Sequence, residues 1–297
     1  MSSHRIIRWE NGQVSVEDAQ GRAMHSRIGP IAEAHSVYLE PSRLVERLSS
    51  DVAEPLVLLD VGMGLATNVV VALEALAGLK RPSRPLRIES FETQTEGLEL
   101  ALATPEAFPW LEPHRGPLDQ LLEKGTWKSE APYPIEWRLH RGDFRDALDG
   151  LPDQSVELVF FDFYAPKTCP ELWSPVLFER LARKLNPATG LLATYSSATP
   201  VRAALLLAGW YLAAGPKTAA KLDTTLAALS PDALPQESLL GETWKRKLDT
   251  STQVAPEALL PSGSVPEERA RIDAAIRERL RSHPQWALPP RKTKEHP

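Results

Sequence analysis

A regular alternation of short apolar segments and helical segments, from about residue 50 to residue 230, constrains the fold of this chain more than any other feature. The first apolar segment, 56–62, is a continuous run that ends in glycine. Six further candidate strands follow it, at 86–92, 136–143, 156–162, 191–196, 210–214 and 225–229. Continuous apolar strands separated by helices are typical of parallel strands buried on both faces. The pattern therefore predicts an α/β fold, a doubly wound and mainly parallel sheet of seven strands.

Two segments of different character lie before and inside this core. Residues 1–50 hold a hairpin signal, Asn11-Gly12 between two short apolar stretches, and then a helix predicted from Pro41 to Leu48. Residues 105–135 hold six prolines and little periodicity. We predict an N-terminal extension over 1–50, a core domain over 51–230, and an insertion or lid at 105–135.

A proline-rich segment follows the core. Residues 231–297 hold nine prolines and no strand signal. One helix is predicted there, with Ile272, Ile276 and Leu280 on one face. We predict a C-terminal extension over 231–297.

The composition narrows the class of protein. The only cysteine, Cys169, excludes an intramolecular disulfide and a metal site built from several cysteines. Lys and Arg number 34 against 39 Asp and Glu, a net charge of −5, which weighs against nonspecific electrostatic binding of nucleic acid. No apolar run approaches the roughly 18 residues of a membrane-spanning helix, and the first residues lack the apolar core of a signal peptide. A cytoplasmic location is expected.

A pair of glycines, Gly62 and Gly64, follows the first strand. Glycine at this place lets a ligand approach the backbone closely, and the N–H groups of the next helix add a positive end. A tight strand-to-helix turn without a ligand explains the same residues. The third glycine of the dinucleotide fingerprint is missing, so the turn alone is weak evidence for NAD.

Carboxylates end the next two strands. Glu92 can accept hydrogen bonds from both hydroxyls of a ribose, and Asp143 stands where this architecture commonly faces an adenine amino group. Each alone could instead stabilise the start of the following helix. Because ligands bind at the carboxyl ends of successive parallel strands, Gly62, Gly64, Glu92 and Asp143 together predict a nucleoside site without a phosphate requirement. This set suits S-adenosylmethionine better than NAD.

A third carboxylate, Asp162, ends a very apolar strand among aromatic residues. An unpaired carboxylate is costly to bury, so we interpret Asp162 as functional, with a paired structural role as the alternative. No serine-hydrolase or nucleotide-triphosphatase motif accompanies it.

The block around Asp162 carries a family resemblance. Asp162-Phe163-Tyr164-Ala165-Pro166-Lys167-Thr168-Cys169-Pro170-Glu171-Leu172-Trp173 resembles the D-G-F-A-P-x-x-N-P-x-(M/L)-W signature of the tRNA wobble-uridine 5-aminomethyl methyltransferases, MnmD and the methyltransferase half of MnmC. Further motifs fit in the same order, namely His25-Ser26 with Glu33-Ala34, the turn from Gly62 to Asn68, Ser90-Phe91-Glu92, and 192–198 with Val201-Arg202. The resemblance covers about residues 22–230. Phe163 replaces a small residue of the family, and Cys169 replaces an asparagine.

The resemblance implies a class I, Rossmann-like methyltransferase that transfers a methyl group from S-adenosylmethionine to the 5-aminomethyl group of a tRNA wobble uridine, nm5(s2)U to mnm5(s2)U. By matching position it implies a cofactor site at Gly62, Gly64, Asn68, Glu92, Asp143 and Asp162. It implies catalytic roles for Asp162 and Tyr164, and substrate contacts at Glu33, Tyr164 and Ser197. The implied partner is tRNA, and no metal is implied.

Other acceptors and functions stay open. The stretch 215–223 lacks the adjacent basic pair of the family, and with the acidic net charge this favours a small-molecule or protein amine as the alternative acceptor. Cations at 244–247, 269–281 and 291–294 could compensate, although a solvated surface is the simpler explanation of each. A nucleoside-binding protein without catalysis is a third interpretation. An NAD dehydrogenase fits poorly, because no hydride-handling His or Tyr-Lys pair is visible.

Overall fold

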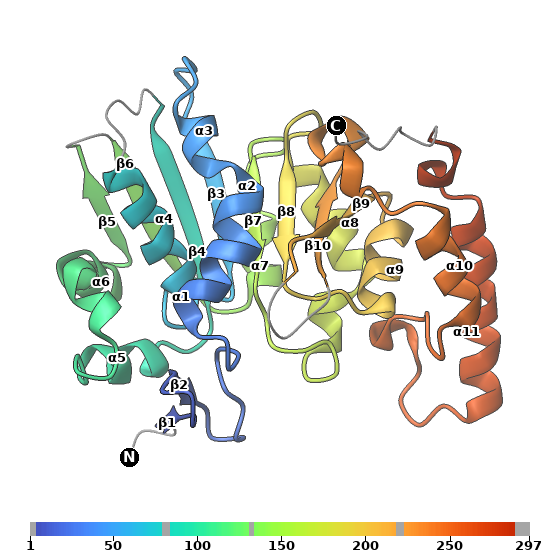
Figure 1. Cartoon of the computed structure of the whole chain (residues 1–297), viewed down its shortest axis with the longest axis horizontal. Coiled ribbons are helices and arrows are strands. Elements are labelled where there is room, and N and C mark those ends of the chain that lie inside the picture. The colour runs from blue at the N-terminus through green and yellow to red at the C-terminus, as the bar shows by residue number, and fades with distance from the viewer. Residues whose placement is uncertain (1–3, 79–83, 131–133, 218–222, 289–297) are drawn as a thin grey trace, which may run out of the picture.

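A central eight-stranded sheet organises the protein (Figure 1). The computed structural model describes residues 4–78, 84–130, 134–217 and 223–288. The strand order is β5-β6-β4-β3-β7-β8-β10-β9. Its strands are β3 (Leu56–Val61), β4 (Leu86–Glu92), β5 (Thr126–Ser129), β6 (Ile135–Arg141), β7 (Leu158–Phe161), β8 (Leu191–Thr194), β9 (Tyr211–Gly215) and β10 (Thr224–Ala228). The five strands from β6 to β8 in this order are parallel, and β10 runs antiparallel to both β8 and β9. The doubly wound, mainly parallel α/β fold is confirmed, with eight strands instead of the seven expected.

The eighth strand comes from the segment expected to be an insertion or lid. After α6 (Arg115–Lys124), β5 pairs antiparallel with the outer edge of β6. Trp127 lies opposite Trp137, and the Lys128 ammonium lies 3.0 Å from the Glu136 carboxylate. A four-residue strand has little sequence signal of its own, because its stability comes from these cross-strand pairs.

Both faces of the sheet are covered, as the continuous apolar strands predict. Alternate residues of β3 point to opposite faces of the sheet. Leu58 belongs to the hydrophobic cluster that includes residues of α4 (Thr67–Ala77) and α5 (Glu96–Leu102). Leu59 belongs to the cluster that includes residues of α7 (Phe144–Leu148), α8 (Pro175–Lys184) and α9 (Thr199–Leu207). The carboxyl ends of the parallel strands are therefore held at one rigid edge of the sheet.

The N-terminal extension contains the expected hairpin and a longer helical region than expected. Strands β1 (Arg5–Arg8) and β2 (Val14–Glu17) pair around a turn in which Gly12 has φ +82°. The helical region begins at Pro30, not at Pro41, and consists of α1 (Pro30–Glu33), a π-helical segment (Ala34–Leu39), α2 (Glu40–Ser42) and α3 (Leu44–Leu48). Pro41 lies inside it, because the wider π-helical turn relieves the clash that proline makes in a regular helix.

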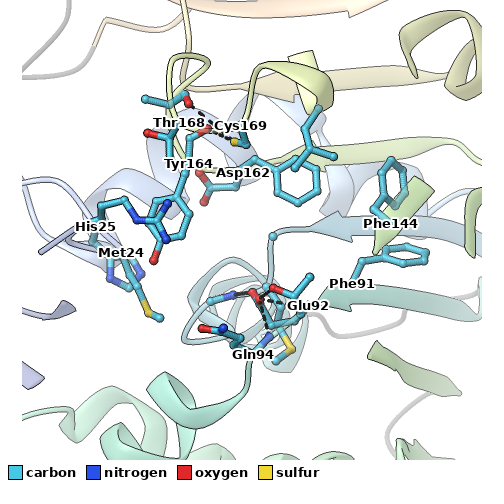
Figure 2. Close-up of a pocket in the computed structure, with 18 of the residues that line it drawn as sticks. Met24, His25, Phe91, Glu92, Gln94, Phe144, Asp162, Tyr164, Thr168 and Cys169 are labelled. Carbon is cyan, nitrogen blue, oxygen red and sulfur yellow. Dashed lines mark hydrogen bonds between the residues drawn. The ribbon is translucent and has the colours of Figure 1, made fainter. Parts of the chain in front are cut away.

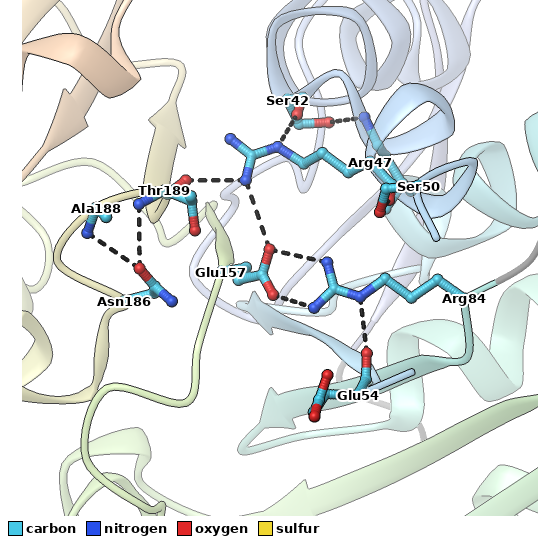
Figure 3. A network of polar contacts seen from close by, with 10 residues as sticks. Ser42, Arg47, Ser50, Glu54, Arg84, Glu157, Asn186, Ala188 and Thr189 are labelled. Carbon is cyan, nitrogen blue, oxygen red and sulfur yellow. Dashed lines mark hydrogen bonds and ion pairs between the residues drawn. The ribbon is translucent and has the colours of Figure 1, made fainter. Parts of the chain in front are cut away.

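An ion-pair network fixes the end of the sheet opposite to the carboxyl ends (Figure 3). The Arg84 guanidinium binds both oxygens of Glu157 and donates from Nε to the Glu54 carbonyl at 2.7 Å. Arg47 lies 3.8 Å from Glu157 and donates to the Thr189 carbonyl at 2.8 Å. Glu54, Arg84, Glu157 and Thr189 lie one or two residues before β3, β4, β7 and β8, so the network connects the starts of four strands.

The C-terminal extension packs against the core domain beside α9 (Figure 1). Its helices α10 (Glu242–Thr250) and α11 (Pro266–Arg281) bury Trp244, Leu248 and Ile276 in the same cluster as α8 and α9. The Gln285 side chain accepts from the Leu212 N–H at 2.7 Å and donates to the Leu212 carbonyl at 2.8 Å, along the outer edge of β9. Among the described residues, no helix has the length and apolar character to cross a bilayer.

Candidate active site

A cavity of about 550 Å³ opens at the carboxyl ends of β3, β4, β6 and β7 (Figure 2). The N-terminal extension forms its opposite wall with Arg22, Met24 and His25. Eight of the nine predicted site residues line the cavity, namely Glu33, Gly62, Gly64, Asn68, Glu92, Asp143, Asp162 and Tyr164. Ser197 is not among the lining residues. The expected lid segment at 105–135 contributes no described residue to the lining either.

The two glycines of the first turn meet different surroundings. A β-carbon on Gly62 would lie 2.5 Å from the Asp162 carbonyl oxygen, so this glycine lets β3 and β7 approach each other closely. A β-carbon on Gly64 would meet nothing within 4 Å, because this residue faces the open cavity. Both glycines line the cavity, and Gly64 has the open space that a ligand close to the backbone would need.

The Glu92 carboxylate, at the end of β4, connects the turn after this strand to the turn that contains Gly62 and Gly64. Its Oε2 accepts from the Gly64 N–H at 2.9 Å, and its Oε1 accepts from the N–H groups of Thr93 at 2.8 Å and Gln94 at 3.2 Å. These bonds fix the carboxylate at the cavity wall, where it is half-buried.

Asp143 lines the cavity and also caps α7. Its Oδ1 accepts from the Arg145 N–H at 2.8 Å, and the Arg145 side chain pairs with both carboxylate oxygens. The Arg145 guanidinium holds the Asp143 pKa below its usual value. Phe144 and Phe91 pack beside it with ring centroids 4.9 Å apart, which gives this end of the cavity apolar walls. Asp143 therefore has the capping role considered from the sequence, and its carboxylate still lines the cavity.

Asp162 lies at the end of β7, where three other polar groups surround it. Asn68 donates from Nδ2 to Asp162 Oδ2 at 2.9 Å. Burial and, next, the Asp162 charge raise the pKa of Tyr38 and of Tyr195 well above the usual value. The Tyr195 hydroxyl donates to the Phe163 carbonyl at 2.9 Å. The carboxylate thus has a fixed orientation and neutral hydroxyl neighbours.

Asp60, behind the glycine turn, was not predicted from the sequence. It is fully buried in β3, and burial is the main cause that raises its pKa to about 7. Ser90 donates to its Oδ2 at 2.7 Å and accepts from Trp137 Nε1 at 2.9 Å, whereas Oδ1 has no hydrogen-bond partner among the described residues. The signal was an acidic residue inside the continuous apolar run of the first strand.

His25 connects the N-terminal extension to the start of α4. Its Nδ1 lies 3.2 Å from Ser15 Oγ, and its Nε2 lies 3.3 Å from Thr67 Oγ1. Burial lowers the His25 pKa to about 4, so the ring is neutral at physiological pH. The sequence marked this residue only through its place in the family motif.

Of the eight described lysines and arginines in the stretches that could compensate, 244–247 and 269–281, four pair with acids. In α11, Arg277 lies beside Asp273, and Arg281 lies 2.9 Å from Asp249. In α10, Lys245 lies 3.3 Å from Glu242. Residues 218–222 and 291–294 lie outside the described residues. In the described part of the chain, no three His, Cys, Asp or Glu side chains form a group that could hold a metal ion.

Comparisons with known proteins show similarity to methyltransferases. Residues 120–230 match a family model described as S-adenosyl-L-methionine-dependent methyltransferase. The tRNA 5-methylaminomethyl-2-thiouridine biosynthesis bifunctional protein MnmC of Pseudomonas paraeruginosa is 32% identical over 213 residues, 70% of this chain and 32% of that protein. MnmC of Chromobacterium violaceum is 29% identical over 238 residues, 78% of this chain and 36% of that protein. The chain thus spans about a third of the length of these relatives.

A solved structure supports the fold. MnmC2 from Aquifex aeolicus superposes with a TM-score of 0.69 at 23% identity, over 94% of this chain and 84% of that chain. The family model's description confirms S-adenosylmethionine as the expected cofactor. This chain is therefore a relative of the S-adenosyl-L-methionine-dependent methyltransferases, with the MnmC proteins among the sequences that it resembles.

Proposed function

We propose that this chain transfers a methyl group from S-adenosylmethionine to the primary amine of a 5-aminomethyl group on a tRNA wobble uridine. The observation that carries the proposal is the Asp162 carboxylate, held by Asn68 in the cavity that also contains Gly64 and Glu92. The names of the MnmC relatives refer to 5-methylaminomethyl-2-thiouridine, which is the product of such a methylation.

The residues of the cavity fit the cofactor. Gly64 leaves open space next to the backbone, and Glu92 offers carboxylate oxygens for ribose hydroxyls. Asp143 would accept from the adenine amino group, between the apolar walls formed by Phe91 and Phe144. When bound, S-adenosylmethionine supplies an electrophilic methyl group on a sulfonium centre.

Asp162 would act on the acceptor amine. The amine must be neutral to attack, and it becomes positively charged as the nitrogen–carbon bond forms. A fixed carboxylate beside that nitrogen stabilises the developing charge. Because the same carboxylate also favours the protonated amine, Asp162 or water must first take up a proton.

Glu33 and Tyr164 would contact the acceptor, since both line the cavity near Asp162. Glu33 is oriented by the Ser26 N–H, which donates to its Oε2 at 3.2 Å. Ser197, which follows β8, would contact a part of the substrate outside the cavity. A tRNA substrate also implies a cytoplasmic location.

The test is methyl transfer from labelled S-adenosylmethionine to bulk tRNA from cells that lack wobble-uridine methylation, followed by nucleoside analysis. We expect label in 5-methylaminomethyluridine. Asp162→Asn is expected to lose about 100-fold or more in kcat, with the cofactor Kd changed only a few-fold by calorimetry. Asp51→Asn, at an exposed position remote from the cavity, is the matched control.

Two outcomes would contradict the proposal. Cofactor binding without label in tRNA would favour a small-molecule or protein amine, to be sought with the same assay on metabolite and protein pools. Cofactor binding without transfer to any pool would favour a protein that binds the nucleoside without catalysis.

A further inference from the structure

Arg22 and Tyr164 contact each other at the wall of the cavity. The guanidinium carbon of Arg22 lies 4.3 Å from the centroid of the Tyr164 ring. Arg22 belongs to the N-terminal extension and Tyr164 to the loop after β7, and both line the cavity. Two segments more than a hundred residues apart thus meet at the cavity wall.

Asp18 fixes the position of this arginine. Its carboxylate accepts from Arg22 Nε at 2.6 Å, and its Oδ1 accepts from the N–H groups of Gln20 at 2.9 Å and Arg22 at 3.0 Å. The Asp18 side chain is only 4% exposed, so the pair is shielded from solvent on the carboxylate side. The bonds to Asp18 therefore keep the Arg22 side chain at the cavity wall.

The contact lies on the acceptor side of the cavity. The Arg22 charge acts on Tyr164 and Cys169, both in the loop that follows Asp162. Asp162 is the residue assigned to the amine, whereas Glu92 and Asp143 line the part assigned to the cofactor. A flat group held by Tyr164 and Arg22 would lie next to the amine.

We propose that Tyr164 and Arg22 form the subsite for the pyrimidine ring that carries the aminomethyl group. The base stacks on the Tyr164 ring in place of the guanidinium, and Arg22, still held by Asp18, donates N–H groups to the carbonyl or thiocarbonyl edge of the base. Single-stranded RNA bases are commonly held by stacking on aromatic rings and on arginine planes. Arginine has several N–H donors in one plane, which matches the acceptors at the edge of such a base. This inference rests on the proposed function.

The experiment compares variants by their KM and kcat for hypomodified tRNA and by their Kd for S-adenosylmethionine. Arg22→Ala and Tyr164→Leu are each expected to raise the KM about tenfold or more, with the cofactor Kd unchanged. Arg22→Lys keeps the charge without the planar group and should recover only part of the loss. Tyr164→Phe keeps the ring and should recover most of it. Arg27→Ala removes the same charge from an exposed side chain of the same extension that does not line the cavity, and is the matched control.

The possible results distinguish a failure of the proposed subsite from a failure of the proposed function. If the wild type methylates tRNA but Arg22→Ala and Tyr164→Leu behave like Arg27→Ala, the subsite is overturned and the proposed function stands. If Arg22→Ala raises the cofactor Kd and not the KM for tRNA, Arg22 binds the cofactor carboxylate instead. If the wild type labels no tRNA, the proposed function fails, and this inference fails with it. Melting temperatures near the wild-type value separate a binding defect from a loss of the N-terminal extension.

Discussion

At the scale of single residues, Gly62 and Gly64 stand in one turn but require glycine for different reasons. At Gly62 a side chain would collide with the backbone of Asp162, and φ is +87°. At Gly64 there is space, and φ is +54°, which other residues adopt at a cost of about 1 kcal/mol. Both glycines line the cavity, and the close backbone gives Gly62 an additional role in the fold.

Alanine substitutions should separate these two roles. Gly62→Ala is expected to lower the free energy of unfolding by about 3 kcal/mol, since overpacking adds to backbone strain. Gly64→Ala should lower it by only about 1 kcal/mol but weaken binding of S-adenosylmethionine about tenfold or more. Thermal unfolding and calorimetric titration measure the two effects, and equal loss of stability in both variants would contradict this assignment.

Asp60 makes stability depend on pH in an unusual direction. Its pKa is about 7 in the folded protein, against an ordinary value of 3.8 in the unfolded chain. The folded state therefore holds a proton that the unfolded state has lost between these values. The stability contributed by protonated Asp60 is fully present below about pH 4 and is lost as the pH rises through 7.

Asp60→Asn should remove this dependence. We expect the free energy of unfolding of the wild type to fall, relative to that of the variant, between about pH 4 and pH 7, and to level off above pH 7. Denaturant titrations at several pH values test this expectation. His25 has the opposite sign, because its folded pKa of about 4 lies below the ordinary 6.5 and its contribution is lost as the pH falls from 6.5 toward 4. The His25 contribution is the same in the wild type and in Asp60→Asn, so the difference between their free energies of unfolding at each pH excludes it. The same pH dependence in both proteins would contradict the assignment to Asp60.

At the scale of elements, the Arg84–Glu157–Arg47 network holds the strand starts at the end of the sheet away from the cavity (Figure 3). Glu157 and Arg84 are 12% and 7% exposed, so a lost partner would leave a charge in a poorly solvated place. The strands themselves separate this network from the active site. Stability and ligand binding are thus expected to respond to it independently.

Glu157→Gln should lower the free energy of unfolding by about 3 kcal/mol, because removing one partner leaves two arginines without their counter-charge. The affinity for S-adenosylmethionine should stay at the wild-type value. Asp249→Asn, which breaks a surface pair with Arg281, is the control and should leave the melting temperature almost unchanged. A cofactor affinity that falls together with stability in Glu157→Gln would show that the two ends of the sheet are coupled.

At the scale of the whole molecule, the C-terminal extension protects the open edge of the sheet. The Gln285 amide takes the place of a neighbouring strand beside Leu212 and also donates to the Leu240 carbonyl at 2.6 Å. Unpaired edge strands promote association between molecules. The described part of the extension, 231–288, therefore packs onto the core domain and covers the outer edge of β9.

Gln285→Ala should leave the Leu212 N–H and the Leu240 carbonyl without the partner that Gln285 supplies, whereas the Leu212 carbonyl keeps its bond from the Leu240 N–H at 3.0 Å. We expect the free energy of unfolding to fall by about 2 kcal/mol or more. We also expect concentration-dependent association, measured by light scattering. Gln120→Ala, at an exposed position on α6, is the matched control. A Gln285→Ala protein as stable and monodisperse as the control would show that the β9 edge needs no cover.

The sequence was sufficient for features that depend on neighbouring residues. Strands buried on both faces have continuous apolar runs, so the parallel sheet and the carboxylates at its strand ends were predicted correctly. Short elements were not predicted correctly. The strand β5 was missed because it is stabilised mainly by its pairing with β6. The start of the helical region at Pro30 was missed because the helix continues through Pro41 by a π-helical turn. The segment expected to be a lid, 105–135, instead contributes β5 to the edge of the sheet, because pairing with β6 stabilises this strand.

The sequence by itself determined the α/β class, the order of the core elements, and the residues Gly64, Glu92, Asp143 and Asp162 at the strand ends. Only the tertiary structure decided which distant segments meet. The contacts Asn68–Asp162, Arg22–Tyr164 and Gln285–Leu212 each join parts of the chain that have no local pattern in common. Periodicity records how a segment is buried, whereas a contact between two segments depends on the path of the whole chain between them.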